Sequence, residues 1–206
     1  MAVGDMRFTR RFALLTAGAG ASIAPPAHAH LVQTGFGAFY DGFAHVAVTP
    51  ADLLLVLGVA LLAGQRGTQA ARWALFALPV AWLAGGMLGT RFPAETTLPV
   101  LTTLTFGLAG ALVAINASLR PGGVAAFATV SGLLHGYVNG ATLAPGGASV
   151  LALAGAVTAV FCALTILSAQ VTTLQAGWTR IGVRVAGSWI AAAGVLMLGW
   201  LARPIA

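Results

Sequence analysis

Apolar residues occur along this chain in long, nearly uninterrupted runs. Six such runs follow the first 49 residues, and they cover approximately 50–64, 70–89, 97–117, 122–140, 146–170 and 182–202. Most of them reach or approach the roughly 20 residues that a helix needs to cross the hydrocarbon core of a bilayer. Short segments rich in Gly, Pro and Arg separate the runs, such as GQRG at 64–67 and RPGG at 120–123. The pattern predicts an all-α, polytopic bundle of about six transmembrane helices.

The first 29 residues have the pattern of an export signal. Three arginines precede a short apolar stretch from Phe12 to Ile23, and Ala27-His28-Ala29 then supplies a small-residue cleavage site. We therefore expect a signal peptide at 1–29, removed after export, followed by one transmembrane domain at 30–206. The alternative is that the segment stays attached as an additional short helix.

Composition supports a membrane location. The chain is 59% hydrophobic and 7% charged, whereas soluble domains carry roughly 25% charged residues. Its basic residues are all arginines and stand at the ends of the apolar runs, so its positive charge indicates topology and not a nucleic-acid partner. A single Cys162 excludes an intramolecular disulfide. The loops are too short to hold an enzymatic domain, so we do not expect an enzyme.

The arginines also predict an orientation. If the N-terminus is exported, five arginines fall in cytoplasmic loops and two on the outer side, in agreement with the positive-inside rule. The expected location is the bacterial inner membrane, with both ends of the mature chain on the periplasmic side. Gly132 and Gly136 have the spacing at which small residues let two membrane helices approach closely, so the run at 122–140 is expected to lie against a neighbour.

Several polar side chains are predicted to meet near the outer surface. His135 lies 13 residues into its run, or about 20 Å at 1.5 Å per residue, which places it in the outer third of the bilayer. Asn139 is one helical turn further on the same face. His45 and Asp52 stand at the outer end of the first run, so all four converge at one depth.

Each of these residues has a functional and a structural interpretation. An ionisable residue inside a membrane helix, such as His135, usually lines a functional site, and imidazole is the commonest metal ligand, but a buried neutral histidine can also be purely structural. Asp52 is either a metal ligand or the acid of a capping box that begins at Thr49. His30 is either a capture ligand at the new N-terminus or incidental to the signal. Asp41 lies on the same side, in a Gly-rich segment expected to precede the first helix at Pro50, and is either a supporting polar group or a wetted interface residue.

The exported start, which ends in AHAH at 27–30, and two later segments carry a resemblance to a known family. GFAHVAVTPADLLLVLGVALLAGQRG at 42–67 and GLLHGYVNG at 132–140 are similar to the motifs of the HupE/UreJ family, small polytopic proteins associated with hydrogenase and urease maturation and regarded as nickel or cobalt permeases. His45 and Asp52 match the first His and the Asp of the family's H-P-x-x-G-x-D-H pattern, with one extra residue between them. Val46 replaces its Pro, and Leu53 stands where its second His belongs.

The resemblance implies a permease that carries a divalent metal ion inward. Nickel or cobalt is the expected ion, with copper and zinc as further options, and no permanently bound cofactor is expected. His45, Asp52, His135 and His30 would be the ligands, supported by Asn139 and Asp41. Membrane lipid and metalloenzyme maturation proteins would be its partners. The main alternative is an accessory or chaperone-like membrane subunit that transports nothing; an intramembrane serine protease at Ser131 and a bis-histidine haem protein fit the sequence less well.

Overall fold

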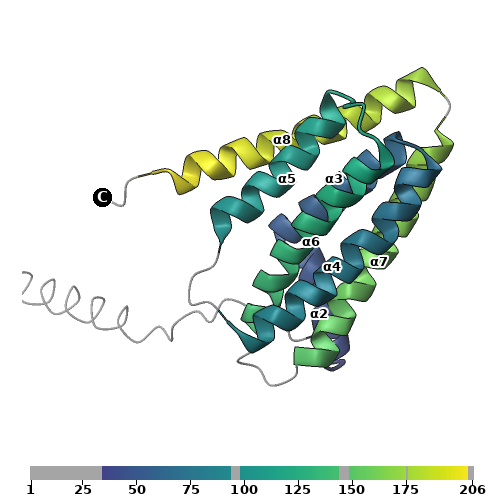
Figure 1. Cartoon of the computed structure of the whole chain (residues 1–206). Helices are drawn as coiled ribbons and strands as arrows, with labels where there is room; N and C mark the ends of the chain where they lie inside the picture. The colour runs from purple at the N-terminus through teal and green to yellow at the C-terminus, as the bar shows by residue number, and fades with distance from the viewer. Residues whose placement is uncertain (1–33, 94–97, 144–148, 175, 204–206) are drawn as a thin grey trace, which may run out of the picture. The chain divides into compact units, whose positions relative to one another are not determined.

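A computed structural model describes residues 34–93, 98–143, 149–174 and 176–203 of the chain. These residues belong to one compact unit, Val32–Ala206. The predicted signal segment and His30 lie outside the described residues. In the described part of the chain every regular element is an α-helix (Figure 1), so the prediction of an all-α bundle is confirmed.

Seven helices follow one another along the described residues: α2 (Ala38–Val48), α3 (Pro50–Gln65), α4 (Thr68–Arg91), α5 (Pro99–Ala114), α6 (Pro121–Leu143), α7 (Ser149–Thr173) and α8 (Gly177–Leu201). The predicted runs from 70 onward match α4 to α8 with ends shifted by a few residues. Proline stands at the first helical position of α3, α5 and α6, where its missing N–H costs no hydrogen bond.

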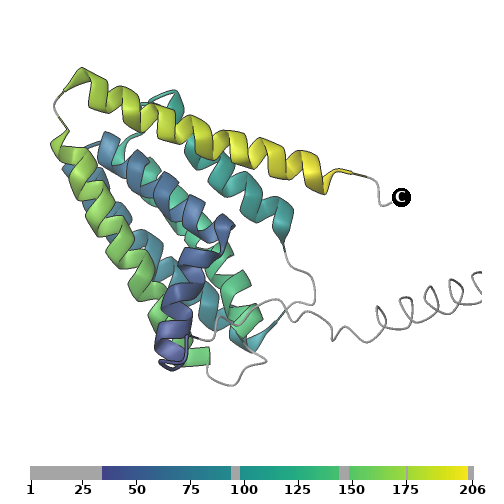
Figure 2. The same cartoon turned by 180° about the vertical axis from the view of Figure 1, so that it is seen from behind.

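The helices form two groups that α3 connects. α4 packs along α6, while α7 contacts α2, α3 and α4. α5 pairs with α8, and this pair contacts the other helices mainly through α3; Figures 1 and 2 show α5 and α8 side by side from both directions. Leu55, Val59 and Leu62 on α3 are fully buried at the centre of the arrangement. α3 is therefore the helix around which the others pack.

Only some of the helices are long and apolar enough to span a bilayer alone. Among the described residues α4, α7 and α8 meet this condition, and α2 with α3 meets it as a pair. α5 has only 16 residues, and α6 is long enough at 23 residues but less apolar. The apolar helices indicate a membrane protein, while the number of six spans stays a prediction.

The start of the first span differs from the prediction. A helix was expected to begin at Pro50 after an irregular segment, but α2 precedes it, and the two helices meet at a 75° bend. The capping box is wrong as well, because no side chain caps α3 and the Thr49 N–H donates to the carbonyl of His45 at 3.0 Å. The preceding helix thus supplies the acceptor for the Thr49 N–H, which the Asp52 carboxylate would have supplied in a capping box. The carboxylate points into the interior instead.

Glycines bring α4 and α6 into backbone contact. A Cβ atom on Gly136 would collide with the carbonyl oxygen of Trp82, and one on Gly85 would collide with that of Leu133. Both glycines are buried in α-helices, where Ala would otherwise be the better helix former. The expectation that the Gly132-to-Gly136 face lies against a neighbouring helix is confirmed, and the neighbour is α4.

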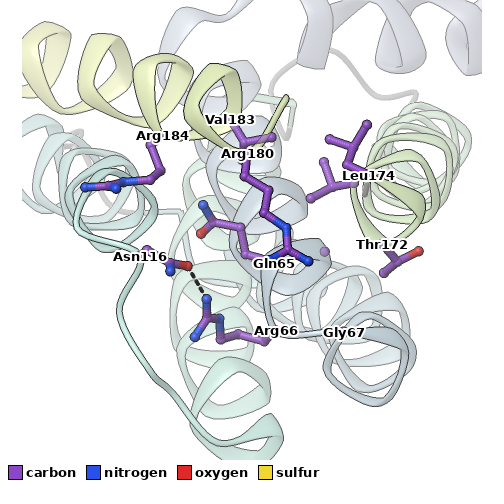
Figure 3. A pocket seen from close by; sticks show the side chains of 11 residues that line it. Gln65, Arg66, Gly67, Asn116, Thr172, Leu174, Arg180, Val183 and Arg184 are labelled. Atoms are coloured by element: carbon purple, nitrogen blue, oxygen red, sulfur yellow. Dashed lines mark hydrogen bonds between the residues drawn. The ribbon is translucent and has the colours of Figure 1, made fainter. Parts of the chain in front are cut away.

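Arginine side chains form hydrogen bonds between neighbouring helices in the region where α3 ends and α8 begins. Arg66, which follows α3, donates to Oδ1 of Asn116 beyond the end of α5 (Figure 3). Arg184 on α8 donates from Nε to the carbonyl of Ala114 at 2.9 Å. The arginine-rich end, as we call this region, therefore holds α3, α5 and α8 together.

Substitution of Gly136 by Ala tests the close packing of α4 on α6. The added methyl group has no space beside Trp82, so we expect destabilisation by about 1–3 kcal/mol, the usual cost of overpacking. Thermal unfolding of the detergent-solubilised protein measures the loss. Gly199→Ala on α8 is the matched control, because a Cβ atom there meets nothing within 4 Å. Equal melting temperatures for the two variants would contradict the packing described here.

Candidate functional site

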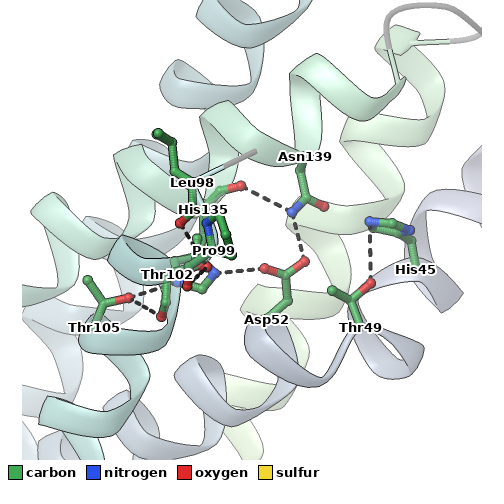
Figure 4. Close-up of polar contacts among 9 residues, drawn as sticks. All are labelled: His45, Thr49, Asp52, Leu98, Pro99, Thr102, Thr105, His135 and Asn139. Atoms are coloured by element: carbon green, nitrogen blue, oxygen red, sulfur yellow. Dashed lines mark hydrogen bonds and ion pairs between the residues drawn. The ribbon is translucent and has the colours of Figure 1, made fainter. Parts of the chain in front are cut away.

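A buried polar cluster connects the start of α3 to the middle of α6 (Figure 4). Nδ1 of His135 lies 2.7 Å from Oδ1 of Asp52, and the amide nitrogen of Asn139 donates to Oδ2 of the same carboxylate at 2.7 Å. Asn139 also donates to the carbonyl of His135 one turn back, at 3.1 Å. A carboxylate only accepts, so Nδ1 of His135 carries the proton in this contact. One carboxylate therefore fixes two side chains of α6.

Thr105 on α5 closes the cluster from the other side. Its hydroxyl lies 2.9 Å from Nε2 of His135 and 2.8 Å from the carbonyl of Thr102. The hydroxyl has a single hydrogen, which it can donate to only one of the two at a time. When it donates to His135 the imidazole is neutral, and when it donates to Thr102 its oxygen can accept from an imidazolium. The protonation state of His135 is thereby linked to the rotation of one hydroxyl.

The cluster is shielded from solvent. His135 is fully buried, Asp52 is 3% exposed and Asn139 is 2% exposed. The ring of Trp82 lies against the imidazole with centroids 5.7 Å apart. Burying a carboxylate without partners is very costly, so the two hydrogen bonds to Asp52 are what make its position tolerable. Buried ionisable groups of this kind in membrane helices mark functional sites by default.

The cluster leaves some hydrogen-bonding capacity unused. Within the described part of the chain, Oδ1 of Asn139 and Nε1 of Trp82 are buried and have no hydrogen-bond partner. Native proteins satisfy nearly all buried polar atoms, so each exception calls for an explanation. Oδ1 of Asn139 is an acceptor on a side chain that already binds Asp52, and it is available to a water molecule or a cation.

Two other predicted site residues, His45 and Asp41, form no hydrogen bond with this cluster in the described part of the chain. His45 is in the last turn of α2, half-buried, and its Nε2 lies 3.4 Å from the Thr49 hydroxyl (Figure 4). The sequence therefore predicted the meeting of Asp52, His135 and Asn139, whereas His45 stands on the other side of the bend. Asp41, expected before the first helix, is in the first turn of α2 and accepts from the N–H and hydroxyl of Thr34 at 2.6 and 2.7 Å.

The residues do not form a ready-made metal cage. In the ranges that the structure describes, no three His, Cys, Asp or Glu side chains gather in a way that could hold a metal ion. Both ring nitrogens of His135 and both oxygens of Asp52 are engaged in hydrogen bonds. A metal ion could bind His135 only after one of these hydrogen bonds opens, and the roles of the four predicted ligands stay predictions.

Two contributors to the cluster were missed by sequence analysis. Thr105 was overlooked because isolated threonines are common in membrane helices, where they usually bond to the preceding turn of their own helix. The signal available was its neighbourhood, since LTTLT at 101–105 places three hydroxyls in one and a half turns of an apolar run. Trp82 lies in the apolar stretch of α4 at 73–88, and no pattern in that stretch shows that its side chain points inward.

Replacement of Asp52 by Ala tests whether the carboxylate is the structural centre of the cluster. The variant leaves the His135 N–H and one of the two Asn139 amide hydrogens buried without an acceptor, so we expect a loss of about 3 kcal/mol. Thermal unfolding in detergent measures it. Ser131→Ala is the matched control, because Ser131 is also buried on α6 but donates only to carbonyls of its own helix. A control as destabilised as Asp52→Ala would show that any buried polar deletion has this effect.

Comparison with known proteins places the chain in a family. The sequence model of the family described as HupE / UreJ protein matches residues 18–197, which include all of the polar cluster. Neither curated proteins nor solved structures give a significant match. The family resemblance of the two motif segments is confirmed, and the chain belongs to the HupE / UreJ family.

Proposed function

We propose that this protein carries a divalent transition-metal ion, nickel or cobalt, inward across the bacterial inner membrane to supply the maturation of metalloenzymes. In this proposal copper and zinc are secondary candidates, the mature N-terminus faces the periplasm, and the protein is a carrier and not an enzyme. The family is associated with nickel or cobalt uptake or with an accessory role for hydrogenase and urease. The observation that carries the proposal is the buried Asp52–His135–Asn139 cluster, an ionisable site inside an otherwise apolar helix bundle.

His135 is the proposed central ligand, and it would bind the ion through Nε2. Metal-binding histidines commonly donate their other ring N–H to a carboxylate, which fixes the ring and raises its basicity. The 2.7 Å contact between Nδ1 and Asp52 has this arrangement. In this proposal Asp52 orients the imidazole and balances the charge of the ion, and it becomes a direct ligand only if its bond to Asn139 opens.

Thr105 would open and close the site. When its hydroxyl donates to the carbonyl of Thr102, the lone pairs of Thr105 Oγ1 and of a neutral His135 Nε2 both become available 2.9 Å apart. Oδ1 of Asn139 supplies a further oxygen acceptor without a partner. One imidazole and a few neutral oxygens would hold a borderline ion weakly. Weak binding suits transport, because an ion that is held too tightly cannot leave.

His45 and His30 are proposed to act before this step. His45 lies in the last turn of α2, just before the bend after which α3 and Asp52 follow. His30 would be the capture ligand of the mature N-terminus. Asp41 would contribute negative charge on the same side, which attracts cations toward the entrance.

An accessory role without transport is the second candidate, and the hydrogen bonding of His135 favours it. Both ring nitrogens are already satisfied and no three-ligand cluster is present among the described residues, as expected of a structural histidine. In that case the cluster would hold α3, α5 and α6 together, and the protein would assist metalloenzyme assembly through its surface.

Metal accumulation in cells distinguishes the two candidates. Cells that express the wild type or His135→Ala at matched membrane levels are supplied with trace nickel, cobalt, copper and zinc, and their metal content is measured by mass spectrometry. We expect the wild type to accumulate one metal and the variant to lose roughly tenfold or more of that accumulation. Ser131→Ala, which leaves the cluster untouched, should accumulate as the wild type does. Wild-type cells that gain no metal would favour the accessory role.

Thr105 offers a test of the opening step. Thr105→Val keeps the shape of the side chain but removes the hydroxyl, whereas Thr105→Ser keeps the hydroxyl. If the hydroxyl exchanges between Thr102 and His135 as proposed, the Val variant transports more slowly and the Ser variant retains transport, at equal membrane levels. Initial rates of radioactive nickel or cobalt uptake measure the difference. A Val variant with the wild-type rate would remove Thr105 from the mechanism.

A further inference from the structure

The arginine-rich end contains a cavity of about 250 Å³ that the proposed transport does not use. It lies between the end of α3, the end of α7 and the start of α8, and Arg66, Arg180 and Arg184 line it (Figure 3). Arg66, which follows the last turn of α3, is 14 residues from Asp52, or about 21 Å at 1.5 Å per residue. The cavity is thus well separated from the buried polar cluster.

The positive charge of the cavity has no acidic partner among the described residues. The only acids in that part of the chain are Asp41 and Asp52, and Asp52 is hydrogen-bonded to His135 and Asn139 in the buried cluster. Arg180 is exposed and its guanidinium forms no hydrogen bond with the described residues, while Nε of Arg66 is buried and has no acceptor among them. Three guanidinium groups around one cavity repel a metal cation and favour an anion, and guanidinium groups bind phosphate oxygens particularly well.

An apolar groove continues from the cavity along the surface between α4 and α7. It has a volume of about 190 Å³ and shares Thr172 with the cavity. Its other lining residues are Thr68, Ala71, Arg72 and Leu75 of α4 and Thr165, Ser168 and Ala169 of α7, and its exposed surface is mostly apolar. A hydrophilic anion such as free phosphate would gain nothing from contact with this apolar surface. An acyl chain, in contrast, fits an apolar groove that starts at a phosphate site.

Polar atoms in the cavity also match a hydroxylated headgroup. Oε1 of Gln65 is buried without a hydrogen-bond partner, while its amide nitrogen donates to the carbonyl of Val113 at 3.3 Å. Oε1 is therefore an acceptor with a fixed direction. A headgroup that brings a hydroxyl donor beside its phosphate satisfies both this oxygen and the arginines.

We propose that the cavity at the arginine-rich end binds the phosphate headgroup of an anionic phospholipid, with one acyl chain in the groove between α4 and α7. Basic pockets between membrane helices commonly take up such headgroups. Bound lipid would join the ends of α3, α7 and α8 and neutralise the mutual repulsion of the arginines. The proposal does not rest on metal transport, and it holds whether the protein is a carrier or an accessory subunit.

Lipid-dependent thermal stability of the full-length protein tests the proposal. The protein is purified in a neutral detergent, and phosphatidylglycerol, phosphatidylcholine or inorganic phosphate is titrated into it. We expect phosphatidylglycerol to raise the melting temperature and to saturate, while phosphatidylcholine and inorganic phosphate have little effect. Arg180→Gln should weaken the apparent affinity for phosphatidylglycerol about fivefold, the effect of one basic residue beside an anionic lipid. The Arg180 side chain is exposed and forms no hydrogen bond with the described residues, so its substitution should leave folding intact.

Two further variants separate headgroup from chain. Ala169→Leu, which fills the exposed groove without changing charge, should also weaken the binding of phosphatidylglycerol. Arg203→Gln removes a guanidinium at the far end of α8, where it lies over the ring of Trp200, and should leave lipid binding unchanged. Equal stabilisation by phosphatidylglycerol and phosphatidylcholine, or an Arg180→Gln variant with wild-type affinity, would overturn the proposal. Stabilisation by inorganic phosphate as strong as that by phosphatidylglycerol would replace the lipid with a soluble anion and overturn it too.

Discussion

The contact between Asp52 and His135 is the interaction on which the interior of this protein depends. A carboxylate and an imidazole lie 2.7 Å apart in a fully buried position, and each has one further partner, Asn139 for the carboxylate and Thr105 for the imidazole. Charge in a low-dielectric interior is tolerated only when it is paired and hydrogen-bonded. The pair therefore determines how α3, α5 and α6 can approach each other. The glycine contacts between α4 and α6 then hold α6 at the depth that the pair requires.

The sequence predicted most of the fold and the meeting of three residues of the buried cluster, Asp52, His135 and Asn139. Long apolar runs predicted the helices because segments of that length and hydrophobicity are rarely anything other than membrane helices. The position of His135 along its run predicted that it lies near Asp52 and Asn139. The bend at Thr49 was missed because Thr-Pro-Ala-Asp is a standard start of a helix, and only the tertiary path shows that another helix ends there. Thr105 and the position of His45 depend on helix rotation, which a uniformly apolar sequence does not encode.

The two ends of the molecule have opposite chemistry. One end gathers the imidazole and carboxylate groups at the start of α3, and the other gathers five arginines without a described acid beside them. α3 connects the two, and its interior residues between them are entirely apolar. A cation attracted to the first end meets increasing positive potential toward the second. Neutralisation of the arginines by a bound anion would lower that potential. A cation would then move toward the arginine-rich end at a smaller electrostatic cost.

The break between α2 and α3 has a consequence for the charge of Asp52. Because the chain turns at Thr49, a new helix begins there, and the buried Asp52 stands in its first turn. The unpaired N–H groups at a helix start amount to roughly half a positive charge, and they stabilise an anion beside them. The carboxylate thus has a source of positive potential that contains no ionisable group and does not change with pH. Discontinuous helices in membranes provide such fixed potentials at the depth where they break. A continuous first span would have kept the same residues and lost this electrostatic support.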